Sequence, residues 1–536
     1  MRKLSTLVFA ISVFSISVTA QNAGMNIAGS AKVNLVNGTY LLMDGDLKIS
    51  VTEGLVIPTE TYVSTGEDLT LNAPNALVVE SDATGRGSYI VNGAVSHSAT
   101  GSAKVESFIS GSAGLNYYMH FVGAPIEDTT TGWGGKVRLQ QFDMTYLDTY
   151  AFEWDATVDT TTGQPWVNVW PYWYEVPVGN GLTLSNYVAG TGTIVMTGYP
   201  VSGTVSYTIR HFSNNHLELI SNPFPSAIDF DDFASDNSSY IENKYYIYDP
   251  TTGNYIARAS GIGGTRYLQH GQGFFVETKG NGTINFTNAH KTHSDDPFRE
   301  VIMNLLTVKV TGGSIGFKDE TYICFTNYAS KGFDEEIDAK KWNSVSAGAT
   351  MINTMADDNT RLAINNLPIE ELLSDLTTVP MHFVCGEDAE YTLRFEGIET
   401  FDQYNEVWLE DILAQTDWVS ITNSDNLYSF TASPGDDVHR FNIHFFGPTA
   451  IDDPVIGDAD GLLKIFSSKE NAYVVNTSDE KIKEVVIYDL MGQQVLRKTV
   501  PGQNTLKLYV SDQTGYYVVR VLTDKKVHTE KILILK

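Results

Sequence analysis

Two imidazoles and two carboxylates lie close together in one polar stretch of the sequence. His290 and His293 lie on either side of Lys291, and Asp295 and Asp296 follow them. These are the residue types that a metal ion or a general acid and base would need. The lysine between the histidines, the polar composition and the proline at 297 instead favour a solvated loop between domains. We therefore predict no metal site here.

A second group of carboxylates comprises Asp229, Asp231 and Asp232. Two carboxyl groups on either side of a sugar linkage would suit glycosidic chemistry. Adjacent acids are commoner in a turn or at the start of a helix, where they accept hydrogen bonds from backbone amides. We expect this second, structural role.

Hard oxygen ligands of the kind that calcium prefers gather near residue 455. They are Asp452, Asp453, Asp458 and Asp460, followed by Gly461. The twelve-residue calcium loop with its closing glutamate is missing, so a weakly held calcium ion is the one cofactor that the sequence leaves open.

Common catalytic motifs are absent from the sequence. It contains no Gly-x-Ser-x-Gly elbow, His-Glu-x-x-His pair, phosphate-binding Gly-x-x-x-x-Gly-Lys or strand-linked Gly-x-Gly-x-x-Gly. A triad assembled from distant residues is defined by geometry and leaves no such trace. We expect a protein that is not an enzyme, with no catalytic residue assigned.

Four aromatic residues lie at even-numbered positions, and in a continuous strand they would point to the same face. They are Trp166, Trp170, Tyr172 and Tyr174. If residues 165–176 formed one strand, this ribbon could stack on sugar rings. Trp173 would point to the opposite face and Pro171 would interrupt the hydrogen-bond ladder, so core packing is the stronger interpretation.

Only two cysteines are present, Cys324 and Cys385, and both lie in apolar, strand-like contexts. A disulfide between two strands of one domain and two buried free thiols are both open interpretations. Disulfides cannot be the general scaffold of the chain.

Composition and charge restrict the partners. Of 536 residues, 42% are hydrophobic and 18% are charged, which predicts folded modules, roughly three or four by length. Sixty-four acidic side chains against 35 basic ones give a net charge of −29. Such a charge repels nucleic acids and anionic lipid surfaces, so neither is expected as a partner.

The N-terminus is typical of an export signal. Arg2 and Lys3 precede an uncharged run over 4–18, and Val18 and Ala20 offer the small residues of a cleavage site. The run is too short and too rich in serine for a membrane span. We predict that residues 1–20 are removed and that no transmembrane anchor follows.

Alternating strands with frequent turns predict an all-β, multidomain chain, with one short helix expected at 369–376. The Gly-, Asn- and Thr-rich part resembles the rungs of a short β-solenoid, although we count no strict repeat length. The predicted order is signal peptide 1–20, solenoid-like region 21–109, β-rich body domain 110–298, β-sandwich with both cysteines 299–448, acidic linker 449–460 and C-terminal domain 461–536.

The C-terminal segment 461–536 differs in charge from the rest of the chain. It holds ten lysines and two arginines against eight acids, a net charge of +4. Seven candidate strands follow one another, which predicts an immunoglobulin-like sandwich. They are 463–466, 472–476, 483–488, 494–500, 505–509, 515–522 and 527–535.

Three segments of this tail, 485–495, 513–521 and 530–534, resemble in order and spacing the C-terminal sorting domain of type IX secretion cargo proteins. The residues that carry the motif are Tyr488, Asp489, Gly492, Gly515, Tyr516, Arg520 and Lys531. Independently of that resemblance, Arg520 and Lys531 would place charge on strands that are otherwise apolar edges. The resemblance implies passage through the type IX machinery to the cell surface, followed by cleavage and attachment to lipopolysaccharide or by release. The Pro-Asn-Pro turn that often opens this domain is missing from 465–470.

The middle regions resemble, more loosely, the non-catalytic bodies of surface proteins that carry such tails. The resemblance is carried by 218–229, 246–249, 272–276 and 288–290. It implies an exported structural or adhesive protein at the cell surface or outside the cell, which binds a glycan or self-assembles. The alternative is a glycan-binding or glycan-degrading protein that uses the aromatic ribbon.

Overall fold

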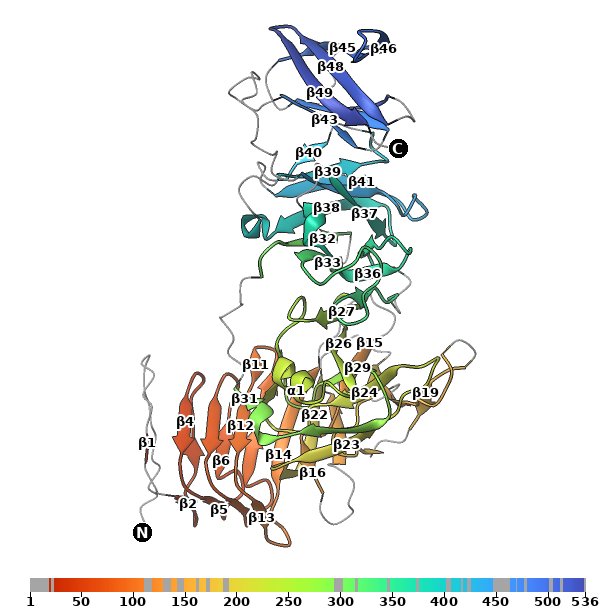
Figure 1. The fold of residues 1–536 in the computed structure, drawn as a ribbon. Helices are drawn as coiled ribbons and strands as arrows, with labels where there is room; N and C mark the ends of the chain where they lie inside the picture. Colours follow the sequence, from red (N-terminus) through yellow and green to blue (C-terminus); the bar gives the residue numbers. More distant parts are fainter. Residues whose placement is uncertain are drawn as a thin grey trace. The chain divides into compact units, whose positions relative to one another are not determined.

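The chain is almost entirely β-structure, as the alternating sequence predicts (Figure 1). It divides into two compact units, the first made of Met1–Glu300, Ser314–Phe317 and Glu335–Ala349, the second of Val301–Gly313, Lys318–Asp334 and Thr350–Lys536. The computed structural model describes residues 19–20, 24–109, 118–128, 136–141, 149–160, 163–169, 174–186, 192–293, 302–313, 317–344, 348–372, 376–401, 406–415, 418–421, 426–446, 463–468, 470–476, 480–500, 505–510 and 514–534.

The first unit begins with a parallel β-solenoid, which confirms the predicted architecture of this region (Figure 1). Its strands stack into three parallel faces. The first face is β2 (Met25–Ile27), β5 (Leu47–Ile49), β8 (Leu69–Leu71) and β13 (Val95–His97); the second is β3 (Val33–Asn34), β6 (Leu55–Ile57), β9 (Leu77–Val79) and β14 (Ala103–Ile109); the third contains β4 (Tyr40–Met43), β7 (Tyr62–Thr65) and β12 (Ser88–Val91).

The rungs have a regular length that we did not find in the sequence. Met25 pairs with Leu47 and Leu47 with Leu69, so two successive rungs have the same length, a spacing of 22 positions along the chain. Leu69 then pairs with Val95, which makes the third rung longer, with a spacing of 26 positions. The longer rung contains a small hairpin, β10 (Ser81–Asp82) and β11 (Gly85–Arg86). The spacing is therefore constant over the first two rungs and is broken by one insertion in the third, so the repeat is regular but not strict.

Apolar side chains fill the interior of the solenoid and aspartates hold its corners. Leu47, Ile49 and Leu69 are fully buried, in keeping with a stack in which each rung covers the next. At one corner, the amide of Asp68 donates to Asp46 Oδ1 at 3.1 Å, and the amide of Ala94 donates to Asp68 Oδ1 at 2.8 Å. These carboxylates satisfy amides that the turn leaves without a strand partner.

The last rung continues into the next part of the chain. Strand β14 pairs in antiparallel fashion with β22 (Gly192–Pro200), which pairs with β17 (Lys136–Gln141). The sheet therefore runs across position 109, where composition predicted a domain border. Further sheets follow the orders β15 (Tyr118–Val122), β21 (Leu182–Asn186), β18 (Thr149–Trp154), β19 (Trp166–Asn168), and β24 (Leu217–Ser221), β29 (Gly273–Thr278), β26 (Ile241–Asp249), β27 (Asn254–Ala259).

Helix α1 (Phe230–Asp236) lies beside these sheets and was not predicted. Asp229 is its N-cap and accepts hydrogen bonds from the amides of Asp231 and Asp232. Phe230 and Phe233 are fully buried in an aromatic core. The helix has only two turns and is too short to show a clear period in the sequence.

The second unit begins with one long sheet around a single apolar core. Its helix, α2, spans only Ile369–Leu372 of the predicted 369–376, and 373–375 lie outside the described residues. The strands follow the order β40 (Val419–Ser420), β39 (Glu406–Asp411), β42 (Phe441–Phe446), β37 (Thr377–Val384), β35 (Met351–Met355), β36 (Arg361–Pro368), β33 (Phe317–Thr326), β32 (Leu305–Gly312), β38 (Ala389–Glu396) and β41 (Leu427–Ala432).

The tail forms a two-sheet sandwich, which confirms the fold predicted for 461–536. One sheet is β43 (Leu463–Ser468), β44 (Asn471–Asn476) and β47 (Thr505–Tyr509). The other has the order β46 (Gln494–Thr499), β45 (Ile482–Asp489), β48 (Gly515–Thr523) and β49 (Val527–Ile534). The seven observed strands match the seven predicted ones closely, and an apolar core of their own lies between the sheets.

Candidate functional site

The sorting motif builds a tight turn between β45 and β46. Asp489 Oδ1 accepts hydrogen bonds from the amides of Met491 at 2.9 Å and Gln493 at 2.8 Å. Gly492 has a φ of 81°, a left-handed conformation that favours glycine. The spacing of Asp489 and Gly492 is therefore what closes this hairpin.

The same turn presents apolar side chains to solvent. Leu490 is 61% exposed and Met491 is 92% exposed, whereas Tyr488 just before them is half-buried. Uncovered apolar side chains on a folded domain are typical of a contact surface. The tip of this hairpin is therefore solvent-accessible, as are the motif residues Tyr516, Arg520 and Lys531.

The two charged motif residues lie on different kinds of strand. Lys531 belongs to β49 at the edge of its sheet, and its Nζ lies 4.2 Å from the centre of the Tyr516 ring. Its charge protects that edge, as the sequence suggested. Arg520 belongs to β48, which lies between β45 and β49, so the expectation of an edge position is wrong for this residue. Gly515 opens β48 opposite Ile534.

The predicted aromatic ribbon does not form one strand. Trp166 lies on β19, which pairs with β18, whereas Tyr174 lies on β20 (Tyr174–Glu175), which pairs with β17 in another sheet. Trp170 and Tyr172 lie outside the described residues. Even spacing places side chains on one face only within a continuous strand, and here the chain changes sheets. The proline at 171 also has no backbone N–H to donate to a strand ladder. The ribbon interpretation is therefore wrong as stated.

Trp166 is instead part of an aromatic cluster. Its ring lies edge-on to Trp154 at 5.0 Å and 5.9 Å from Phe275, and Trp154 Nε1 donates to the carbonyl of Leu217 at 2.9 Å. Edge-to-face aromatic pairs of this kind stabilise a core. The structure favours the packing interpretation for this tryptophan.

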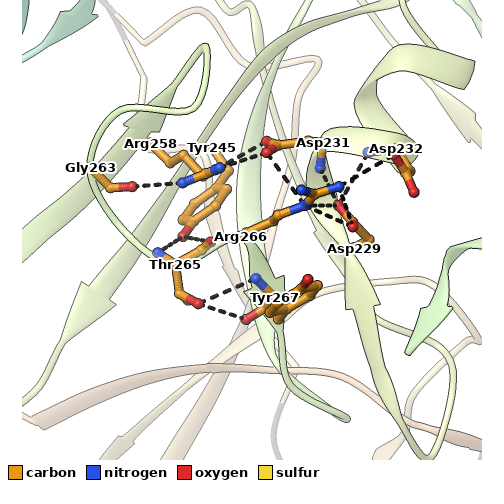
Figure 2. Close-up of polar contacts among 9 residues, drawn as sticks. All are labelled: Asp229, Asp231, Asp232, Tyr245, Arg258, Gly263, Thr265, Arg266 and Tyr267. Atoms are coloured by element: carbon orange, nitrogen blue, oxygen red, sulfur yellow. Dashed lines mark hydrogen bonds and ion pairs between the residues drawn. The ribbon is translucent and has the colours of Figure 1, made fainter. Parts of the chain in front are cut away.

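The acidic group at the start of α1 is held by two arginines (Figure 2). Arg258 makes a two-pronged contact with Asp231, with Nε donating at 3.1 Å and Nη2 at 2.6 Å. Arg266 Nε and Nη2 both lie 2.8 Å from Asp229 Oδ2, and the carboxylate of Asp232 lies 3.7 Å from the same guanidinium. Their carboxylates are occupied by cation and cap contacts, which supports the structural role over a glycosidic one.

The histidine stretch is packed rather than solvated. His290 is 1% exposed; its Nε2 lies 3.0 Å from an oxygen of Asp236, and its Nδ1 accepts the amide of Thr287. His293 lies between the hydroxyls of Ser64 and Ser88, each 2.8 Å away. The expectation of a solvated loop is wrong for these residues because His290 packs against α1 and His293 bonds to the solenoid. Asp295 and Asp296 lie outside the described residues.

Lys291, between the two histidines, has a lowered side-chain pKa. Its Nζ donates to the carbonyl of Val91 at 2.8 Å and lies 4.4 Å from the centre of the Phe224 ring. Burial lowers the pKa of this lysine to about 7. Within the described ranges, no group of three or more metal-ligating side chains is found here or elsewhere.

The two cysteines are both buried and free in the structure. Cys324 lies on β33 and Cys385 follows β37. Burial raises the pKa of the Cys324 thiol to about 11, which leaves it protonated and unreactive at neutral pH. Of the two interpretations left open by the sequence, the structure has the free thiols and not the disulfide.

One buried carboxyl group escaped the sequence analysis. Glu218 on β24 is 7% exposed, and its Oε1 accepts a hydrogen bond from the Tyr207 hydroxyl at 3.2 Å. The Tyr207 hydroxyl also lies 3.0 Å from Asn180 Oδ1, so its one hydrogen is shared between these two acceptors, and Asn180 Nδ2 donates to Glu153 Oε1. Burial raises the pKa of Glu218 to about 7. The apolar residues Leu219 and Ile220 signal a buried strand, but nothing in the sequence signals that burial outweighs the charge of Arg210, which acts to lower the pKa of Glu218.

Replacing Glu218 with glutamine is expected to stabilise the protein above pH 7. The folded pKa lies above the ordinary value of 4.5, so the stability associated with Glu218 is complete below pH 4.5 and is lost as the pH rises through about 7. At 1.36 kcal/mol per unit, the full loss is about 3 kcal/mol. Thermal unfolding of Glu218→Gln and wild type at pH 5 and pH 8 measures it. A gain that is equal at both pH values contradicts this origin.

No helix within the described part of the chain is long and apolar enough to cross a membrane. No curated protein matches the sequence. Among solved structures, the comparison gives a biofilm-associated protein, BSP domain, with 9% identity and a TM-score of 0.15, covering 82% of this chain and 64% of that one. It also gives the Bacillus anthracis TIE protein, with 8% identity and a TM-score of 0.09, covering 80% and 75%. This chain thus spans under two thirds of the first structure.

Two families match the sequence, and together they cover most of it. Residues 468–535 match the secretion system C-terminal sorting domain, which confirms the resemblance carried by the tail. This domain directs the chain through the type IX machinery to the cell surface or the extracellular space. Residues 12–445 match the family described as a domain of unknown function (DUF8693). The chain therefore belongs to the DUF8693 family and ends in a secretion system C-terminal sorting domain.

Proposed function

We propose that the exported body of this chain is a non-catalytic structural or adhesive element of the cell surface. The observation that carries this proposal is the use of its chemically capable side chains. Asp229 and Asp231 hold arginines, His290 bonds to Asp236, and His444 lies 3.0 Å from a carboxylate oxygen of Glu410. Groups that are bound in this way hold a fold together and are poorly placed to act on a substrate.

The solenoid supplies the second support. A stack of similar rungs presents repeated side chains along its outer faces, which suits an extended contact with a surface or with other copies. Thr70 and Ser96, for example, stand on adjacent rungs with their hydroxyls 3.0 Å apart. Such rows of small polar groups offer many weak contacts in place of one deep site.

Cells with and without the protein test the proposal directly. We expect cells that lack it to lose attachment or aggregation, and added purified protein to restore the lost property in a saturable way. Light scattering on the purified mature protein then separates self-assembly from attachment to a glycan or matrix protein, tested on a panel with and without calcium. A catalytically inert protein leaves every offered polysaccharide uncleaved.

Enzyme activity would overturn the proposal, and one variant makes that outcome decisive. Glu218 is the described carboxyl group whose pKa lies nearest that of a general acid at neutral pH. Saturable cleavage of a polysaccharide that is lost in Glu218→Gln, while folding is preserved, would show a hydrolase. The matched control is Glu242→Gln, because Glu242 is also buried but is paired with Lys279 at 3.0 Å.

A further inference from the structure

A cavity of about 200 Å³ lies where the solenoid meets the sheets that follow it. It is lined by residues from the β11 hairpin, from β14 and β15, from the end of β26 and from the loop before β29. Its volume is well above the roughly 30 Å³ that one water occupies in the liquid. The polar members of its wall include Arg86, Ser107, His120 and Gln272.

Arg86 reaches this cavity because of the insertion in the solenoid. It ends β11, in the hairpin that makes the third rung longer than the two before it. Its Nη1 donates to the carbonyl of His270 at 2.7 Å. Among the described residues, no carboxylate lies within ion-pair distance of this guanidinium, and Nε and Nη2 have no acceptor. That edge of an arginine is the one that grips a carboxylate with two parallel hydrogen bonds.

A buried guanidinium without a paired carboxylate, such as that of Arg86 in the cavity wall, lowers the stability of the fold. Burial lowers the pKa of Arg86 to about 10, which still leaves the group charged at neutral pH. In a chain with a net charge of −29, carboxylates are plentiful, and yet none of the described ones meets this side chain. A bound anion would supply the missing charge.

Two more polar side chains in the wall lack hydrogen-bond partners within the described part of the chain. His120 is half-buried, and burial together with the charge of Arg86 lowers its pKa to about 4, so it is neutral at pH 7. Ser107 is 1% exposed, and its hydroxyl is buried with no partner. Buried polar groups are normally satisfied, so unsatisfied ones that meet at a cavity point to a ligand that satisfies them.

The rest of the wall suits a ring. Phe121 and Tyr248 contribute aromatic surface, with ring centres 6.3 Å apart. Aromatic faces beside a few fixed polar groups are the usual composition of a sugar or small-molecule site. We propose that this cavity binds a carboxylate-bearing ligand of monosaccharide size, an acidic sugar, with its carboxylate on the Nε and Nη2 edge of Arg86 and with hydrogen bonds from His120 and Ser107.

Glucuronate and glucose test the inference, because they differ only in the carboxylate. We expect glucuronate or its epimer galacturonate to raise the unfolding temperature of the mature full-length protein in a saturable way, and glucose to leave it unchanged. Calorimetric titration gives the affinity. The absence of any response to both uronates, or an equal response to glucose, overturns the inference. A response to acetate and phosphate as strong as that to the uronates overturns the assignment to a sugar.

Variants then assign the site. Arg86→Met is expected to lower the affinity at least about tenfold, since a charge-assisted pair is lost. It is also expected to leave the stability of the ligand-free protein unchanged or higher, which a purely structural arginine would not do.

Ser107→Ala removes a hydroxyl with no partner and is expected to fold and to bind a few times more weakly. Lys32→Gln, at an exposed cation of the same solenoid, is the control and should bind normally. Normal binding by Arg86→Met, or by Ser107→Ala if the first variant does not fold, overturns the site.

Discussion

A chain that lacks residues 461–536 is expected to fold and to accumulate in the periplasm, with nearly complete loss of the protein from the cell surface. The sorting domain is the part that addresses the chain to the outer membrane machinery. Among the described residues, its strands β43 to β49 pair with one another and enclose their own core, so their removal breaks no described sheet of the body and uncovers the apolar contact of Trp408 and Phe446 with Val475 and Phe466. Protease accessibility on intact cells and fractionation of the periplasm measure the outcome.

The reciprocal fusion is the control for this experiment. Residues 461–536 joined to a folded periplasmic reporter should carry that reporter to the surface, because the tail folds as a separate sandwich. A truncated chain that still reaches the surface would refute the sorting role of the tail. A reporter that stays in the periplasm would show that the body also carries part of the signal.

The regular fold of the tail and the solenoid could be predicted from the sequence because both depend on local alternation. The strands of the tail are short and are separated by turns, and some, such as β47, alternate between buried and exposed residues, so they can be read directly from the sequence. The period of the solenoid was also present in the sequence, at Leu47 and Leu69, each preceded by an aspartate. It was missed because the described residues hold only three full rungs and the third contains an insertion.

The candidate sites could not be predicted because they depend on which strands meet. The parity argument for Trp166 and Tyr174 required one continuous strand, and the chain instead changes sheets between them. Conversely, no sequence motif links Arg86, Ser107 and His120. They line the same cavity because β14 continues the solenoid sheet into the sheet that contains β22. Glu218 shows the same limit, since its apolar neighbours predict a buried strand but not that burial outweighs the charge of Arg210.

Removal of one partner of the buried ion pair in the second unit is expected to cost about 3–5 kcal/mol of stability. Arg440 and Asp411 have side chains that are 5% and 1% exposed. Nη2 of the arginine lies 2.9 Å from Asp411 Oδ2, and its Nη1 donates to the carbonyl of Thr431. The guanidinium carbon lies 4.4 Å from the Phe430 ring centre, so Asp411→Ala would leave a buried cation beside an apolar ring, with the Thr431 carbonyl and, 3.9 Å away, the carboxylate of Asp436.

The thermal transition of this part of the chain should fall by roughly 10 °C in Asp411→Ala, because a domain of this size loses about 2–4 °C per kcal/mol. The fluorescence of Trp408 and Trp418, in or next to the same sheet, follows that transition.

Glu396→Ala is the matched control: its partner Lys309 is 2.7 Å away, but both side chains are at least 34% exposed, so a loss of less than about 1 kcal/mol of stability is expected. The double replacement Asp411→Leu with Arg440→Met should recover much of the loss, since it removes both charges together. Equal losses in Asp411→Ala and in the double variant would show that the hydrogen bonds Asp411 accepts from Leu413, Ala414 and Tyr428, or packing volume, and not the uncompensated charge, set the cost.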